Sequence, residues 1–144
     1  MKVGILGIGL IGGSLALAAR KHIPDAEIFG LDKNEDNLNR SIAIKLIDFK
    51  LKSVDLKLMD LLLITIPVDA ASKEIVSLLD LVHDNGLVID FGSTKASICD
   101  QVALHSKRGQ FLATHPIAGT EFSGPDAAME LSLIHIWRCR RIER

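Results

Sequence analysis

The segment from Thr114 to Gly124 has the residue types of a catalytic loop. It reads Thr-His-Pro-Ile-Ala-Gly-Thr-Glu-Phe-Ser-Gly, has neither helical nor strand periodicity, and follows the short apolar run 111–113. An unperturbed imidazole titrates near pH ~6.5, so His115 is suited to accept a proton. Irregular polar chain directly after a strand is where α/β proteins place chemistry, because the rigid sheet holds such loops in position. The alternative is that His115 and Pro116 only end a strand at a tight turn.

A second pattern, near the N-terminus, has the glycine spacing of a dinucleotide-binding turn. The apolar run 2–6 leads into Gly7-Ile8-Gly9-Leu10-Ile11-Gly12, and the helix-forming stretch 13–20 follows. In the order strand, G-x-G-x-x-G, helix, the first glycine permits the turn. The second lets a diphosphate approach the backbone, and the third lets the helix lie close to the sheet. The helix start also offers free N–H groups and about half a positive charge to the phosphates.

An acidic residue stands where the adenosine ribose of a bound dinucleotide needs one. The apolar run 28–31 predicts a second strand, and Asp32 ends it, 20 positions beyond Gly12. Its carboxylate can accept hydrogen bonds from the ribose hydroxyls and would repel a 2′-phosphate, which favours NAD over NADP. The neighbouring Lys33 keeps NADP open as the less favoured cofactor. Asp32 can also be the N-cap of the helix that follows.

Further apolar runs predict the strands that position these residues. Residues 61–66 have the length and composition of a central parallel strand that is covered on both faces, and 86–91 and 111–113 predict two more. Residues 46–50 alternate between apolar and polar types, as an edge strand does, and 51–59 stay undecided between strand and connection. Serial strand-helix units imply right-handed crossovers. We therefore predict an α/β fold of the Rossmann type, doubly wound, with a mostly parallel sheet.

Capping residues predict where the later helices begin and end. Asp69 is placed to cap a helix that runs to about Leu79. Ser93 or Thr94 can cap the next helix, which we expect to end at residues 107–109, where two cations and a glycine stand.

The predicted strand ends converge on one edge of the sheet, which is where doubly wound proteins bind ligands. Thr65 and Pro67 would flank the cofactor there, although a plain strand end explains them too. The turn 90–95 reads Asp-Phe-Gly-Ser-Thr-Lys, and Ser93 could donate a hydrogen bond toward the nicotinamide or a substrate hydroxyl. The alternative for Ser93 is a helix cap only.

Bulk properties narrow the class of protein. The chain has 144 residues, about one domain, with 48% hydrophobic and 24% charged residues and a formal net charge of −1. There is no basic stripe for nucleic acid, no apolar run of membrane-spanning length, no signal peptide and no His/Cys spacing for a metal. Two cysteines make a poor disulfide framework. These properties predict a cytoplasmic enzyme without metal, nucleic-acid or membrane binding.

The segment 114–124 closely resembles the active-site signature of prephenate dehydrogenases, the NAD(P)-linked enzymes of tyrosine biosynthesis. The turn 90–95 resembles a second motif of that family. The resemblance implies oxidative decarboxylation of prephenate: hydride leaves the hydroxyl-bearing carbon for the nicotinamide, a base takes the hydroxyl proton, and loss of carbon dioxide makes the ring aromatic. It assigns the role of base to His115, with Ser93 as its hydrogen-bonding neighbour.

Three classes of function stay open beside one another. They are a prephenate or closely related arogenate dehydrogenase, another NAD(P)-dependent hydroxyacid dehydrogenase, and a nucleotide-binding module without enzyme activity. The catalytic candidates are His115 and Ser93. The candidates for cofactor binding are Gly7, Ile8, Gly9, Leu10, Ile11, Gly12, Asp32, Thr65, Pro67 and Ser93.

The resemblance covers residues 1–130, which we expect to be the NAD(P)-binding domain with the start of the active site. Residues 131–144 differ from the family, contain the only Trp and have four arginines among the last seven positions. We expect them to be a non-native or disordered tail, and a basic tail for an anionic partner is the alternative. The family also has a C-terminal helical domain, which forms the homodimer and supplies cations for the substrate carboxylates. This sequence lacks that domain, so we expect dinucleotide binding with little or no activity.

Overall fold

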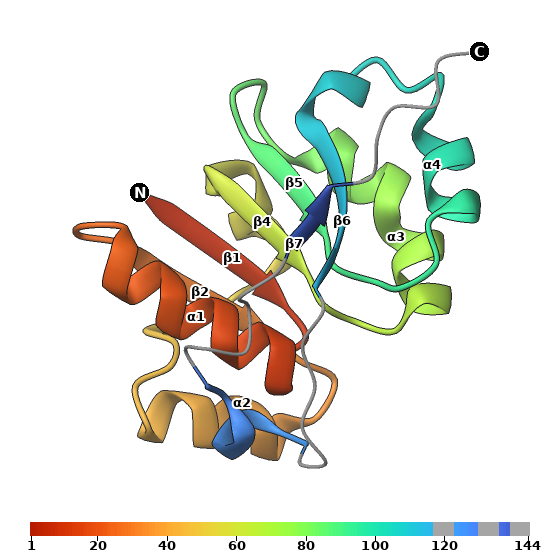
Figure 1. Cartoon of the computed structure of the whole chain (residues 1–144). Helices are drawn as coiled ribbons and strands as arrows, with labels where there is room; N and C mark the ends of the chain where they lie inside the picture. Colours follow the sequence, from red (N-terminus) through yellow and green to blue (C-terminus); the bar gives the residue numbers. More distant parts are fainter. Residues whose placement is uncertain (117–122, 130–135, 139–144) are drawn as a thin grey trace.

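The computed structural model describes residues 1–116, 123–129 and 136–138. Strands that are far apart in this sequence lie side by side in one sheet (Figure 1). The strands in these ranges are β1 (Lys2–Leu6), β2 (Glu27–Leu31), β3 (Phe49–Lys50), β4 (Leu61–Ile64), β5 (Leu87–Asp90), β6 (Phe111–Pro116) and β7 (Ile136–Arg138).

The order of the strands across the sheet is β3-β2-β1-β4-β5-β6-β7. The six strands from β3 to β6 pair in parallel, and β7 pairs antiparallel with β6. The chain builds outward from β1 to β3, then crosses back to place β4 on the other side of β1. This doubly wound order confirms the predicted Rossmann-type α/β fold. The non-native or disordered tail expected at 131–144 stays a prediction, because most of that segment lies outside the described residues.

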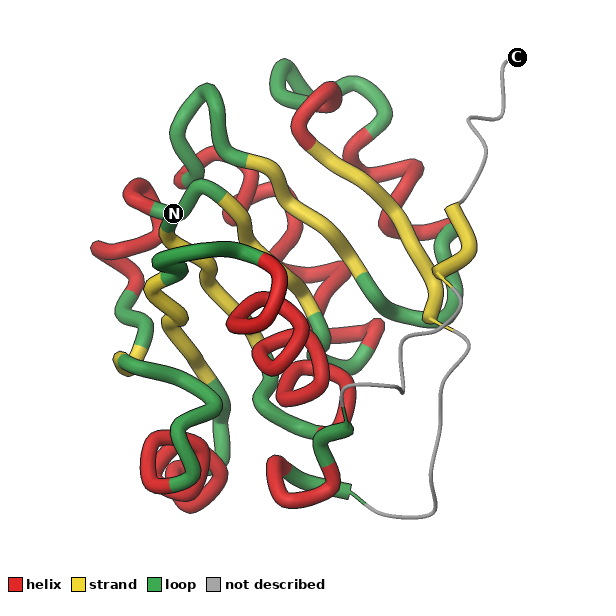
Figure 2. Tube along the Cα trace, turned by 60° about the vertical axis from the view of Figure 1, so that its left-hand side comes forward, coloured by secondary structure: helices red, strands yellow, loops and turns green. Residues whose placement is uncertain are grey.

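Helices cover both faces of the sheet, as Figure 2 shows. The helices α1 (Leu10–His22) and α2 (Glu35–Ala43) pack on one face, and α3 (Val68–Leu81) and α4 (Ala96–Val102) pack on the other. Three short 3₁₀ helices connect the larger elements: η1 (Ser53–Leu58), η2 (Arg108–Gln110) and η3 (Pro125–Ala127). None of the helices within the described ranges combines the length and apolar character needed to cross a bilayer.

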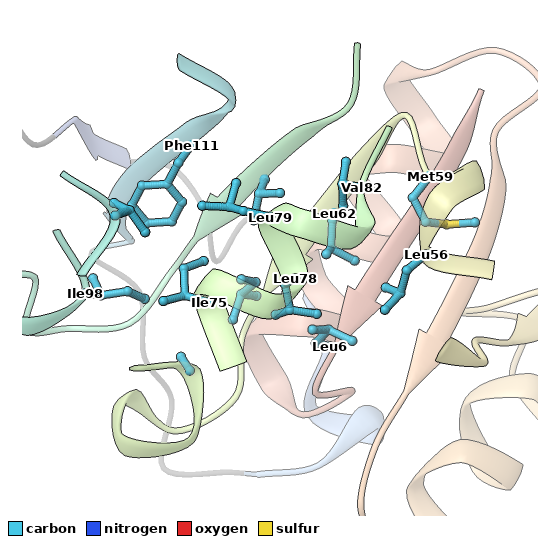
Figure 3. Close-up of a cluster of buried hydrophobic side chains, with 14 of the residues drawn as sticks. Leu6, Leu56, Met59, Leu62, Ile75, Leu78, Leu79, Val82, Ile98 and Phe111 are labelled. Carbon is cyan, nitrogen blue, oxygen red and sulfur yellow. The ribbon is translucent and has the colours of Figure 1, made fainter. Parts of the chain in front are cut away.

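The core has two halves, one on each face of the sheet. On the α1 side, Leu15, Ala16 and Ala19 recur at helical spacing and meet the side chains that β1 and β2 point toward them. On the α3 side, the helix face with Ile75, Leu78 and Leu79 packs on the opposite side of β4 and β5 (Figure 3). The central strands are almost wholly apolar because both of their faces are covered.

The helix after β5 is shorter than predicted. We expected it to end at residues 107–109, but α4 ends at Val102. The ring of His105 accepts a hydrogen bond from the backbone N–H of Lys107, which shapes a turn in place of further helix. Lys107 and Arg108 donate to carbonyls of Val82 and Phe111, so their charges serve contacts between elements rather than a helix end.

Two expected helix caps, and the alternative of Asp32 as a cap, were wrong. The N-cap of α3 is Pro67, and Asp69 lies in the first turn. The N-cap of α4 is Lys95, not Ser93 or Thr94. Asn34, rather than Asp32, caps α2 by accepting from the N–H groups of Asp36 and Asn37. Each carboxylate or hydroxyl that we had expected at a cap lies one or more positions from the true start of its helix.

The region 46–59 resolves into two different elements. Only Phe49 and Lys50 form the edge strand β3, because Leu46 and Ile47 turn into the core. The undecided residues contain η1, whose Leu56 is buried beside Met59. The remaining strand predictions hold, with ends shifted by no more than three residues.

The last described part of the chain returns to the first helix. A Cβ on Gly13 of α1 would lie 2.7 Å from the Cβ of Ala128, and the backbone N–H of Met129 donates to the hydroxyl of Ser14 at 3.0 Å. Arg40 of α2 forms a bidentate ion pair with Asp126 of η3, with distances of 2.6 to 3.1 Å between guanidinium nitrogens and carboxylate oxygens. The segment 124–129 is therefore held against both helices of one face.

Candidate active site

The glycine-rich turn follows β1, at the point between β1 and its neighbour β4 where the order of the strands reverses. Gly7 has φ of +93°, a conformation that favours glycine, and its N–H donates to the carbonyl of Leu31 at 2.7 Å. The hydroxyl of Thr65, just after β4, approaches the carbonyl oxygens of Leu6 at 2.9 Å and Gly7 at 2.5 Å. Thr65 was predicted to flank a cofactor, and in the structure it ties the turn to the neighbouring strand.

The other two glycines of the motif have different surroundings. A Cβ on Gly12 would lie 2.0 Å from the carbonyl oxygen of Gly7 and 2.8 Å from the hydroxyl of Thr65, so this position needs glycine for close packing. A Cβ on Gly9 would have no atom of the described residues within 4 Å. The protein itself thus packs against Gly12, whereas the backbone at Gly9 faces open space that a ligand can approach.

The N-terminus of α1 has no side-chain cap and no acidic residue of its own. Gly9 is its N-cap and provides no side-chain hydrogen bond, and the first turn contains no acidic residue. Free N–H groups and the positive end of the helix dipole therefore face the same open space as Gly9. Leu10 and Ile11 are half-buried in this first turn, while the side chain of Ile8 is fully buried in the core.

Asp32 lies beside this turn at the end of β2. Its Oδ2 accepts from the backbone N–H of Ile8 at 2.7 Å, and its Oδ1 accepts from the N–H of Asn34 at 2.8 Å. A carboxylate has about four lone-pair positions, so each oxygen keeps acceptor capacity for a further donor. The structure thus brings the predicted acidic residue into direct contact with the predicted phosphate-binding turn.

His115 lies on β6 with an exposed side chain. Its Nδ1 is 3.2 Å from the carbonyl oxygen of Gly92. Because a carbonyl only accepts, this contact requires the proton on Nδ1, and in the neutral ring Nε2 is then the acceptor. We expected Ser93 to be the hydrogen-bonding neighbour. Within the described part of the chain the bond is instead to the preceding residue, and Ser93 is exposed beside it.

A buried ion pair next to His115 was not among the predicted site residues. The ammonium of Lys95 contacts the carboxylate of Asp90, and the two side chains are only 10% and 2% exposed. Asp90 also accepts from the N–H of Gly92 at 3.2 Å, and its backbone carbonyl accepts from the Thr114 hydroxyl at 2.9 Å. The signal in the sequence was a pair of opposite charges on either side of a glycine turn.

The sheet sets the spacing of these groups along its carboxyl edge. The strands that carry them are consecutive: β1 before the glycine turn, β4 before Thr65, β5 before Gly92, and β6 with His115. Neighbouring strands lie about 4.8 Å apart, so three intervals separate β1 from β6 by about 14 Å. Pro67 is exposed two residues beyond Thr65 at the same edge. An elongated ligand on the glycine turn would lie along this edge toward His115.

Other histidines of the described chain have structural contacts. His105 Nε2 is 3.2 Å from Asp80, and His83 Nδ1 accepts from the N–H of Asn85. His22 is exposed in the last turn of α1. His135 and residues 117–122 of the predicted catalytic loop lie outside the described residues. In the ranges that the structure describes, no three His, Cys, Asp or Glu side chains gather as a metal site would require.

Comparison with known proteins gives one consistent result. Residues 15–135 match the family model described as prephenate dehydrogenase, nucleotide-binding domain. The prephenate dehydrogenase of Bacillus subtilis is 34% identical over 133 residues, which are 88% of this chain and 35% of that protein.

Two solved structures have the same fold over most of the chain. The prephenate dehydrogenase of Aquifex aeolicus, solved with hydroxyphenyl propionate and NAD+, has a TM-score of 0.80 at 26% identity and covers 92% of this chain and 47% of its own. Synechocystis arogenate dehydrogenase has a TM-score of 0.74 at 25% identity, over 92% and 46%.

The chain spans 35–43% of the length of the curated relatives that it matches. The match to the family model covers most of the chain and includes the turn 90–95 and the segment that begins at Thr114. The chain therefore belongs to the family of prephenate dehydrogenase nucleotide-binding domains.

Proposed function

We propose that this chain binds NAD along the carboxyl edge of its sheet and that it serves the oxidative decarboxylation of prephenate to 4-hydroxyphenylpyruvate. In this proposal His115 is the base. The observation that carries it is the geometry of His115, which is exposed, donates from Nδ1 to Gly92 and keeps Nε2 as an acceptor.

Three features of the chain fit a dinucleotide. The open space at Gly9 would admit a diphosphate, and the N–H groups at the uncapped start of α1 would bind it. The spare acceptor capacity of Asp32 suits the ribose hydroxyls and disfavours the 2′-phosphate of NADP. The A. aeolicus relative, solved with NAD+, supports the same cofactor. We assign Gly7 to Gly12, Asp32, Thr65, Pro67 and Ser93 to this site.

The residues of the chain would handle the proton of the reaction. Bound NAD would supply the hydride acceptor. Nε2 of His115 would take the proton of the substrate hydroxyl, and the exposed hydroxyl of Ser93 would donate a hydrogen bond near that oxygen. The fixed Nδ1 contact with Gly92 would hold the ring ready for this transfer. Release of carbon dioxide makes the ring aromatic and the reaction effectively irreversible.

Arogenate is the second candidate substrate, because the Synechocystis arogenate dehydrogenase has a similar fold and similar identity to this chain. Another hydroxyacid as substrate, or nucleotide binding without catalysis, are the remaining outcomes. We further propose that residues 1–130 are the dinucleotide-binding unit and that the complete protein is a cytoplasmic homodimer. A helical domain would supply the cations for the substrate carboxylates, so we expect little turnover from these 144 residues alone.

Two measurements test the proposal. Calorimetric titration of the 144-residue chain should show NAD binding more tightly than NADP, and binding of neither would contradict a dinucleotide site. In the complete protein, assayed with prephenate, arogenate and short hydroxyacids, we expect turnover of prephenate.

The role of His115 has its own test in the complete protein. His115→Asn should lower kcat by about 10²- to 10⁴-fold, the usual contribution of a general base, and leave NAD affinity unchanged. The matched control is His22→Asn, which alters an exposed histidine on the last turn of α1. Near-normal turnover by the His115 variant would refute its role as base.

A further inference from the structure

The groups that hold His115 in place form a continuous series of contacts that begins in the protein interior. The series starts at the buried carboxylate of Asp90, which contacts the ammonium of Lys95. The Oδ1 of Asp90 accepts from the N–H of Gly92 at 3.2 Å. The carbonyl of Gly92 in turn accepts from Nδ1 of His115 at 3.2 Å. One glycine residue thus links a buried charge to an exposed imidazole.

We propose that Asp90, paired with Lys95, is a positioning residue for His115. This inference rests on the proposed function, in which His115 is the base. The carboxylate of Asp90 fixes the turn by accepting a hydrogen bond from the N–H of Gly92. The carbonyl of Gly92 then favours the imidazole tautomer of His115 that has its proton on Nδ1. In the neutral ring Nε2 is then the acceptor and is directed away from this contact, as a base requires.

The burial of the ion pair explains why both partners are needed. A carboxylate that is 2% exposed has lost almost all of its water, and an unpaired charge at this depth would be strongly unfavourable. Lys95, the N-cap residue of α4, supplies the compensating positive charge from the same turn. A second contact ties the strand of His115 to the same residue, since the hydroxyl of Thr114 donates to the backbone carbonyl of Asp90.

A general structural role for the ion pair makes a different prediction from a positioning role. If the pair only stabilises the fold, any replacement that keeps the fold stable should leave the tautomer of His115 unchanged. If Asp90 positions His115, the tautomer should depend on whether the side chain at that position accepts from Gly92. Two double variants separate these cases, because both remove the buried charges and only one retains an acceptor.

The experiment measures the nitrogen chemical shifts of the His115 ring in the 144-residue chain, above the pH at which the imidazole titrates. In Asp90→Asn/Lys95→Met the amide oxygen still accepts from Gly92, so the Nδ1-protonated form should persist. In Asp90→Leu/Lys95→Met no acceptor remains, and the ratio of Nδ1- to Nε2-protonated rings should fall about fivefold, the effect of about one hydrogen bond. Replacing a buried ion pair by apolar residues of similar volume is often neutral for stability, so we expect both variants to fold.

Thermal melts of the two variants show whether each is folded, and Lys57→Met is the control for removal of a lysine at an exposed site in η1. Equal tautomer ratios in the two folded double variants would overturn the inference. Titration of the unaltered chain with NAD is run alongside. If the unaltered chain does not bind NAD, the proposed function fails, but the comparison of tautomer ratios is unaffected. Failure of the proposed function and failure of the inference are therefore distinguishable.

Discussion

The carboxylate of Asp32 accepts a hydrogen bond of 2.7 Å from the backbone N–H of Ile8, inside the glycine-rich turn. The residue proposed to bind the ribose therefore also shapes the turn proposed to bind the diphosphate. A substitution that tests the first role has to preserve the second. Asparagine meets this condition, because its amide oxygen can still accept from Ile8 while the negative charge is gone.

We predict that Asp32→Asn reduces the preference of the chain for NAD over NADP by about tenfold or more. Two charges about 4 Å apart near a protein surface interact by about 4 kcal/mol, so removing the repulsion of a 2′-phosphate exceeds the 1.4 kcal/mol of a tenfold change. Calorimetric titration with both cofactors measures the ratio. Asp36→Asn is the control, since it removes the same charge from the exposed first turn of α2. An unchanged ratio would show that Asp32 does not face the ribose.

Two glycines of the same turn should respond to alanine in opposite ways. At Gly9 the added methyl group meets open space, so Gly9→Ala should cost only the poorer N-cap, about 1 kcal/mol or less, and should weaken NAD binding about tenfold or more. At Gly12 the methyl group would lie 2.0 Å from the carbonyl oxygen of Gly7, so Gly12→Ala should cost about 1–3 kcal/mol of stability. Urea melts and NAD titrations of both variants check this. Full NAD affinity in a stable Gly9 variant would place the diphosphate elsewhere.

The hydroxyl of Thr65 is expected to matter through the backbone of the turn. Thr65→Val keeps the shape of the side chain but removes the donor to Leu6 and Gly7, and should lower the free energy of unfolding by about 1 kcal/mol. NAD affinity should fall in parallel, because the turn loses its tie to β4. Thr65→Ser retains the hydroxyl and should retain most of the affinity. If the serine and valine variants lose affinity equally, the hydroxyl has no such role.

The ion pair between Arg40 and Asp126 should make stability depend on pH. The hydrogen bonds from Arg40 lower the pKa of Asp126 below its ordinary value of 3.8. A carboxyl group whose pKa is lowered by folding contributes stability above its unfolded pKa, and that contribution is lost as the pH falls through the folded pKa.

Asp126→Asn should therefore be less stable than the unaltered chain at pH ~7, and the difference should shrink as the pH falls below ~4 and disappear below the lowered pKa of Asp126. Urea melts at several pH values measure the difference, which salt should also reduce because the pair is exposed. Asp100→Asn, on the exposed side of α4, is the control and should show no such convergence. A difference that stays constant with pH would mean that the charge of Asp126 contributes nothing.

Local patterns in the sequence were enough to predict where most strands lie in the chain and the turn that follows β1. The glycine spacing is informative because Gly7 and Gly12 each meet a local steric requirement. Gly7 has a positive φ, and Gly12 is packed too closely for a side chain. The class of the fold followed from apolar runs, since strands covered on both faces contain few polar residues.

Features that depend on contacts between distant residues were not predictable in the same way. The end of α4 is set by the ring of His105 and by the carbonyls that Lys107 and Arg108 reach on other elements. The pairing of Asp90 with Lys95 depends on how the turn folds back, although both residues were visible in one motif. The hydrogen-bond partner of His115 also depends on how this turn folds. We expected Ser93, and the partner is the carbonyl of Gly92.

The return of residues 124–129 to α1 has a consequence for how the protein assembles. The side of α1 at Gly13 and Ser14 is completed by Ala128 and Met129, which a ribosome makes more than a hundred residues later. A nascent chain that has produced only the glycine turn and its helix still shows this side to water. The first helix, α1, is thus among the last elements whose packing is completed. Protease cleavage near Gly13 should therefore diminish only once Met129 has emerged from the ribosome.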